Sequence, residues 1–160
     1  MTARPDHLAL PSFDAGETFR FYTEVLGFRF KFAFSGESEE WGGAYLMTAY
    51  DYGGGEIHFF DLDGAKRPKP DGLPKDMRHF ALSVGDAREV ARWRKRLAKH
   101  KVPHWTERHG TDLSVYFTDP NGVVLEMTSH KREPFRSGQA RDGLDTLRTW
   151  TAARRQRSPK

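Results

Sequence analysis

The sequence predicts an α+β fold built from two copies of a βαβββ module, and three observations lead to this prediction. A short segment near the N-terminus recurs in the second half of the chain, each copy leads into an amphipathic helix, and three strand-like runs follow each helix. With 160 residues, the chain is long enough for one such domain with a hydrophobic core and too short for two ordinary domains.

The repeated segment is Asp6–Leu10 (DHLAL) in the first half and Arg78–Leu82 (RHFAL) in the second half. Histidine, alanine and leucine occupy equivalent positions in the two copies, and each copy has the alternation of a short strand. An aspartate that can cap a helix follows each strand, Asp14 in the first half and Asp86 in the second. We therefore expect helices at about 15–26 and 87–100.

Three strand-like runs follow each predicted helix, and glycine-rich or proline-containing turns separate several of them. These runs are 28–34, 43–50 and 56–62 in the first half, and 103–108, 112–118 and 123–128 in the second. A linker rich in proline, lysine and glycine joins the halves over about 64–76. We expect a single domain over 1–130, with modules at about 5–63 and 77–129, and a basic, partly helical C-terminal tail over 131–160.

A candidate metal site follows from the alternation of side chains along the strands. His7, His79 and Glu126 each lie on a strand face of small or polar residues, opposite a face of large apolar residues, and His58 would line the same cleft. Because the chain has no cysteine, any metal must bind through nitrogen and oxygen. Two imidazoles and a carboxylate that leave positions open are a donor set of catalytic divalent metals.

Three segments resemble the vicinal oxygen chelate superfamily, which includes glyoxalases, bleomycin resistance proteins and extradiol dioxygenases. They are Asp6–Leu10, Phe21–Phe28 (FYTEVLGF) and Tyr116–Glu126 (YFTDPNGVVLE), and the resemblance covers roughly 5–130. It implies paired βαβββ modules that form a curved mixed sheet around a metal cleft. It also implies that His7, His79 and Glu126 bind a divalent metal ion, which could be nickel, zinc, cobalt, manganese or iron.

The resemblance leaves the role of His58 open between two alternatives. Glyoxalase I enzymes often have a fourth metal ligand at this position, usually a carboxylate or amide, so His58 is either a ligand or an acid–base group. Tyr116 matches a tyrosine that touches substrate in several branches of the superfamily. The pattern admits Glu56 in place of His58 only if the strand register slips by one residue. His104 and His109 are expected in surface loops.

Three functions are compatible with this reading. The favoured one is a glyoxalase-like lyase or isomerase that acts on a small oxygen-chelating substrate, with Glu126 moving a proton. The first alternative is an extradiol-type Fe(II) dioxygenase, in which His58 is the acid–base and Tyr116 a hydrogen-bond donor. The second alternative is a metal-free drug-binding resistance protein.

Composition and charge restrict the partners. The formal net charge is +4, and the excess of basic residues lies in the predicted helix at 87–100 and near the C-terminus, which is typical of solvated surfaces. The chain has no nucleic-acid-binding motif and no apolar run of membrane-spanning length. We expect a cytoplasmic protein with a small-molecule substrate and neither a nucleic acid nor a membrane partner. A homodimer is expected as well, because superfamily members of this size commonly dimerise.

Overall fold

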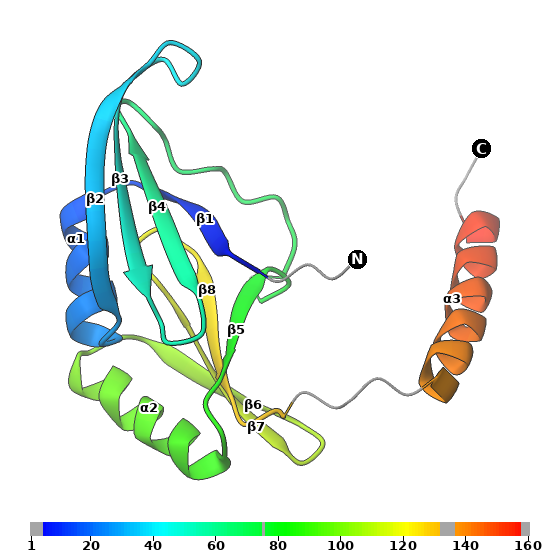
Figure 1. The fold of residues 1–160 in the computed structure, drawn as a ribbon. Helices are drawn as coiled ribbons and strands as arrows, with labels where there is room; N and C mark the ends of the chain where they lie inside the picture. Colours follow the sequence, from blue (N-terminus) through cyan, green and yellow to red (C-terminus); the bar gives the residue numbers. More distant parts are fainter. Residues whose placement is uncertain (1–4, 75, 132–136, 158–160) are drawn as a thin grey trace. The chain divides into compact units, whose positions relative to one another are not determined.

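The computed structural model of this chain describes residues 5–74, 76–131 and 137–157, without the side chains of 137, 139 and 155–157. It divides into two compact units, residues 1–130 and 131–160. The first unit contains both modules, each with one four-stranded mixed sheet (Figure 1). This arrangement confirms the predicted α+β fold with paired βαβββ modules.

The first module forms sheet A, whose strand order is β1-β4-β3-β2. Its strands are β1 (His7–Ser12), β2 (Arg29–Ser38), β3 (Gly43–Asp51) and β4 (Glu56–Leu62). The second module forms sheet B in the equivalent order β5-β8-β7-β6. Its strands are β5 (His79–Ser83), β6 (His104–His109), β7 (Asp112–Thr118) and β8 (Val124–Thr128). In each sheet the first strand pairs in parallel with the last, and the other pairs are antiparallel.

Both predicted helices begin at their aspartate caps. In the first module, α1 (Ala15–Arg20) continues into the π-helical segment η1 (Phe21–Val25), and Asp14 accepts a hydrogen bond of 2.8 Å from the Glu17 N–H. In the second module, Asp86 accepts two backbone hydrogen bonds at the start of α2 (Ala87–Lys99). These side chains satisfy N–H groups that have no partner within the helix.

The two modules share one hydrophobic core. Core-facing side chains alternate along β1, β4 and β5 with side chains on the opposite face of the sheet. On β4, for example, Ile57 and Phe59 are buried, whereas Glu56 and His58 are partly exposed. The fully buried side chains of this core come from both modules and include Tyr22, Tyr50, Ile57, Val90, Leu97, Val115, Phe117 and Leu125.

A buried polar network also joins the modules, because the turn between β7 and β8 contacts α1 and η1. The Asn121 side chain accepts a hydrogen bond of 3.0 Å from the Phe13 N–H and donates one of 3.0 Å to the Thr18 hydroxyl. The Tyr22 hydroxyl donates to the Asp119 carboxylate at 3.1 Å. Burial raises the pKa of Asp119 above its ordinary value, although several N–H groups and Tyr22 oppose the rise.

The second unit contains α3 (Ser137–Arg157). Leu144, Leu147 and Trp150 are exposed on this helix. Among the helices of the described residues, none has the length and apolar character needed to cross a membrane.

Candidate metal and active site

Strand pairing places the predicted site residues on the face of each sheet opposite to the shared core, which we call the cleft face because the sequence predicts a cleft there. In sheet A, His7 lies on β1 and His58 on β4, where His58 pairs with Ala9. In sheet B, Glu126 on β8 lies between Ala81 on one neighbouring strand and Tyr116 on the other. The small Ala9 and Ala81 side chains therefore lie beside His58 and Glu126, two of the predicted site residues.

His79 and Glu126 form a close pair on sheet B. The Nε2 atom of His79 lies 2.9 Å from a carboxylate oxygen of Glu126, whose side chain is 8% exposed. The other ring nitrogen, Nδ1, lies 2.7 Å from the backbone carbonyl oxygen of Asp76. Because a carbonyl oxygen only accepts, Nδ1–H is the donor to Asp76, and the contact of Nε2 with Glu126 is a hydrogen bond whose proton a metal ion would replace.

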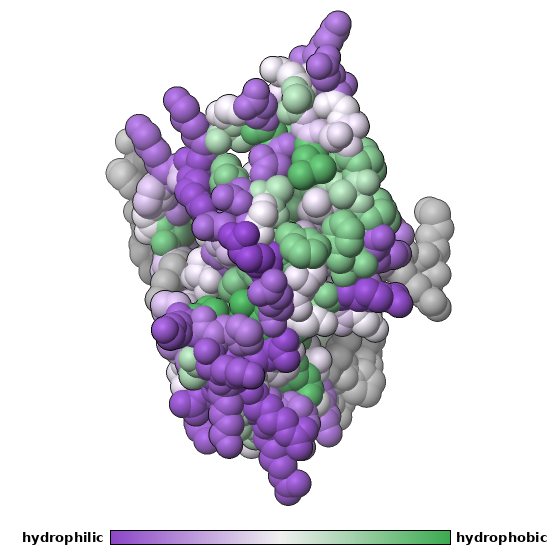
Figure 2. Space-filling model, turned by 90° about the vertical axis from the view of Figure 1, so that its left-hand side faces the viewer, coloured by the Kyte–Doolittle hydropathy of each residue, from purple (hydrophilic) through white to green (hydrophobic). Residues whose placement is uncertain are grey.

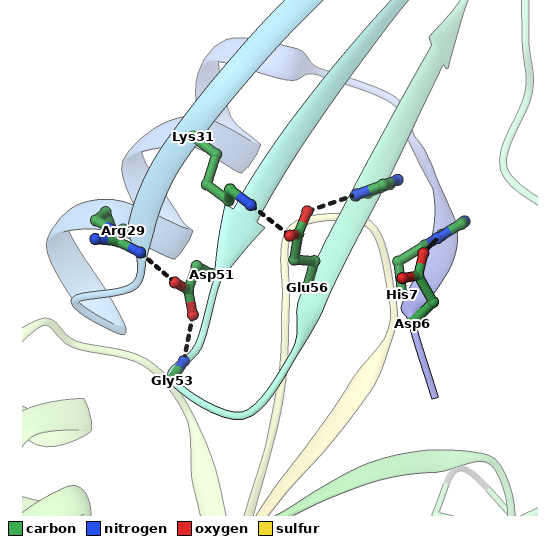
Figure 3. Close-up of polar contacts among 8 residues, drawn as sticks. Asp6, His7, Arg29, Lys31, Asp51, Gly53 and Glu56 are labelled. Atoms are coloured by element: carbon green, nitrogen blue, oxygen red, sulfur yellow. Dashed lines mark hydrogen bonds and ion pairs between the residues drawn. The ribbon is translucent and has the colours of Figure 1, made fainter. Parts of the chain in front are cut away.

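His7 on sheet A has the same arrangement. Its Nδ1 atom lies 2.8 Å from the Asp6 carboxylate (Figure 3), which leaves Nε2 as the donor atom for a metal. The His7 ring stacks on the His58 ring with 4.2 Å between the ring centroids and an angle of 11° between the planes. Both candidate histidine ligands are thus oriented by an oxygen acceptor at Nδ1.

His58 is held differently, through a carboxylate that the sequence prediction placed on the wrong face. The Nε2 atom of His58 lies 3.1 Å from Glu56, and Lys31 also pairs with Glu56 (Figure 3). Glu56 is two residues from His58 and shares its face without any slip in register, while Ile57 faces the core, so the prediction that Glu56 requires a slip is wrong. The Lys31 ammonium, followed by His58, lowers the pKa of Glu56.

Tyr116 lies at the centre of the cleft face of sheet B. Burial, followed by hydrogen bonding to Glu126, raises the pKa of Tyr116 to about 12, so its hydroxyl stays protonated at neutral pH. Trp105 stacks on the Tyr116 ring at 5.3 Å, and the Nε2 atom of His109 lies 3.1 Å from the Tyr116 hydroxyl. The prediction of surface loops for His104 and His109 is wrong, because these residues begin and end β6.

The structure brings the predicted ligands together in two pairs. His7 and His58 lie on sheet A, and His79 and Glu126 lie on sheet B. Within residues 5–74, 76–131 and the described part of α3, no group of three or more His, Asp or Glu side chains could hold a metal ion. The nitrogen and carboxylate donors suit a divalent metal, and each pair supplies part of the donor set.

Comparisons with known proteins agree with the fold. Residues 4–127 match the family model described as Glyoxalase/Bleomycin resistance protein/Dioxygenase superfamily. A comparison with curated protein sequences gives no match.

Solved structures share this architecture at low sequence identity. A glyoxylase/bleomycin resistance protein/dioxygenase domain from Frankia sp. EAN1pec has a TM-score of 0.67 and 19% identity, over 82% of this chain and 100% of that one. Lactoylglutathione lyase from Agrobacterium tumefaciens has a TM-score of 0.60 and 22% identity, over 79% and 93% of the two chains. The fosfomycin resistance protein FosX from Listeria monocytogenes, in a complex with Mn(II) and 1S,2S-dihydroxypropylphosphonic acid, has a TM-score of 0.61 and 18% identity, over 82% and 95%.

Proposed function

This chain belongs to the Glyoxalase/Bleomycin resistance protein/Dioxygenase superfamily, and we propose that it is a divalent-metal-dependent lyase or isomerase that acts on a small oxygen-chelating substrate. The observation that carries the proposal is the orientation of its two histidines. An oxygen acceptor holds Nδ1 of both His7 and His79, and Nε2 of His79 faces the buried Glu126 carboxylate. An oxygen acceptor at one ring nitrogen orients histidines that bind metals in the same way.

The residues that would hold the metal are His7, His79 and Glu126. When bound, such a metal acts as a Lewis acid that polarises substrate oxygens. The Glu126 carboxylate is buried beside the Tyr116 hydroxyl and can take up and return a proton next to a substrate carbonyl. Tyr116 can donate a hydrogen bond to a substrate oxygen, and the Trp105 ring stacks on the Tyr116 ring.

We further propose that two copies of the chain complete the donor set by association of their cleft faces. The two histidine-bearing pairs lie on different sheets, and the cleft face of sheet A exposes aromatic side chains, among them Phe32 (41% exposed) and Phe34 (48% exposed). Large apolar side chains gathered on one face favour association. A homodimer would cover this face and could bring the sheet A pair of one copy close to the sheet B pair of the other.

One observation favours a second candidate, an extradiol-type Fe(II) dioxygenase. The Nε2 atom of His58 lies 3.1 Å from the Glu56 carboxylate, which is not one of the predicted metal ligands, and a histidine paired with such a carboxylate suits an acid–base role. His7, His79 and Glu126 would then form a three-ligand site that leaves positions open for substrate and dioxygen. Tyr116 would remain a hydrogen-bond donor to the substrate.

Elemental analysis of protein purified without a chelator or a histidine tag separates these candidates. Nickel, zinc, cobalt or manganese at near-stoichiometric content, together with interconversion of S-lactoylglutathione with glutathione and its 2-oxoaldehyde, would support the lyase or isomerase. Iron, together with oxygen uptake in the presence of catechols, would support the dioxygenase. Failure to bind any of these metals, even after anaerobic reconstitution, would contradict both enzymes and leave the drug-binding alternative.

A further inference from the structure

A cavity of about 750 Å³ lies beneath the segment that joins the two modules. Its walls are β1, the start of β5, the turn between β7 and β8, and residues of the 70–74 segment. The lining is largely apolar and includes Leu8, Leu10, Leu73, Phe80 and Val124. Cavities of roughly 300–1,000 Å³ with apolar walls and a few polar groups are typical of small-molecule sites.

This cavity is distinct from the proposed metal cleft. On β1, Leu8 and Leu10 alternate with His7 and Ala9, so the cavity opens on the face of β1 opposite to His7. The two sites meet only at His79, which lines one end of the cavity and pairs with Glu126. An apolar molecule could therefore occupy the cavity while the cleft face of sheet A remains accessible.

One ion pair supplies the charge on the cavity wall. The Nη2 group of Arg78 pairs with the Asp71 carboxylate, and both residues line the cavity with side chains 73% and 42% exposed. Asp71 also accepts a hydrogen bond of 3.0 Å from the Leu73 N–H, which holds the 71–73 turn at the wall of the cavity. A guanidinium has five N–H donors, so a contact through Nη2 leaves it able to bind a further carboxylate.

From this arrangement we propose that the cavity binds an amphipathic carboxylate, with the apolar chain between Leu8, Leu10 and Phe80 and the carboxylate on Arg78. The apolar walls suit a hydrocarbon chain. Arg78 supplies the positive charge, and its ion pair with Asp71 shows that a carboxylate fits beside its guanidinium group. Binding of a carboxylate in this cavity requires neither a metal nor the proposed reaction. It can therefore be tested independently of the proposed function.

The test is isothermal titration of the metal-free full-length chain with decanoate, and with decanol as the neutral counterpart. We expect saturable binding of both, and tighter binding of decanoate. Arg78→Gln should weaken decanoate binding by about tenfold, because it removes a charge-assisted hydrogen bond, and should leave decanol binding unchanged. Asp71→Asn should tighten decanoate binding, because Arg78 loses its competing carboxylate.

Two further variants make the result specific. Arg29 is a matched control, since it is 76% exposed and ion-paired with Asp51 but is not among the cavity residues, so Arg29→Gln should bind decanoate as the parent does. Leu8→Trp fills the cavity and should abolish binding of both probes. Absence of saturable decanoate binding, equal weakening by Arg78→Gln and Arg29→Gln, or unchanged binding in Leu8→Trp would each overturn the proposal.

Discussion

The Nε2 atom of His79 lies 2.9 Å from a Glu126 carboxylate oxygen, while its Nδ1 atom lies 2.7 Å from the Asp76 carbonyl oxygen. If this pair binds metal, His79→Ala and Glu126→Gln should each lower the affinity for Mn²⁺ or Ni²⁺ by more than about 100-fold, because loss of a ligand should exceed the effect of a supporting group. Titration calorimetry measures the affinity, and circular dichroism checks the fold. Parental affinity in either variant would rule out that residue as a ligand.

Asp6 provides a graded control for the same experiment. It accepts from Nδ1 of His7, and supporting groups of this kind change metal affinity by roughly 10–100-fold. We expect Asp6→Ala to weaken metal binding less than His7→Ala does. Equal effects would mean that Asp6 itself binds the metal.

Replacement of His58 distinguishes an acid–base role from ligation. Because Glu56 engages Nε2 of His58, we expect His58→Gln to retain metal affinity within about threefold and to lose turnover of whichever substrate the activity screen identifies. Glu56→Gln should retain the metal in the same way. Loss of metal from His58→Gln would instead make His58 the fourth ligand.

Two buried tyrosines predict opposite effects of removing a hydroxyl. The Tyr22 hydroxyl donates to Asp119, whereas the buried Tyr50 hydroxyl makes no hydrogen bond of ordinary geometry among the described residues and has only the Thr48 side chain as a polar neighbour that lowers its pKa. Tyr22→Phe should lower the free energy of unfolding by about 2 kcal/mol, and Tyr50→Phe should leave it unchanged or raise it slightly. Urea denaturation measures both, and similar losses would contradict the assignment of the network to Tyr22.

The pH dependence of stability should have opposite signs for two aspartates. Burial raises the pKa of Asp119 above 3.8, so the folded state takes up this proton first and the stability contributed by Asp119 rises as the pH falls towards 3.8. The N–H groups of Glu89 and Arg88 lower the pKa of Asp86, so its contribution is lost as the pH falls below 3.8. Comparing the parent with Asp119→Asn and Asp86→Asn by urea denaturation at several pH values tests this, and parallel profiles would refute it.

The sequence predicted most of the fold because its strongest signals are local. Strand alternation, aspartate caps and the turn at 119–122 each depend on a few neighbouring residues, and they located both modules and the cleft faces of His7 and Glu126. The prediction for Glu56 failed because it assigned Glu56 and His58 to opposite faces, whereas residues two apart on a strand share a face. Local signals of this kind do not report how two sheets are placed relative to each other.

The contact of His109 with Tyr116 lies within the β6–β7 hairpin and was missed because His109 was expected in a loop. The other parts that the sequence could not predict depend on contacts between segments far apart in the chain. The separation of the predicted ligands into two pairs follows from how the sheets pack on their shared core. The cavity beneath 70–74 requires a linker without helix or strand to return over β1.

The exposed aromatic side chains on the cleft face of sheet A lead us to expect a homodimer. A charged residue introduced on this face should dissociate it. Phe34 is 48% exposed on the cleft face of β2, and Figure 2 shows hydrophobic residues gathered above the hydrophilic region where α2 lies. The parent should have about twice the chain mass of 18.4 kDa in light scattering, and Phe34→Glu should be monomeric because association would bury its charge. Lys95→Glu, an exposed charge change on α2, should remain dimeric. A monomeric parent, or a dimer that Phe34→Glu leaves intact, would mean that this face is not the dimer interface and that two copies do not complete the metal site through it.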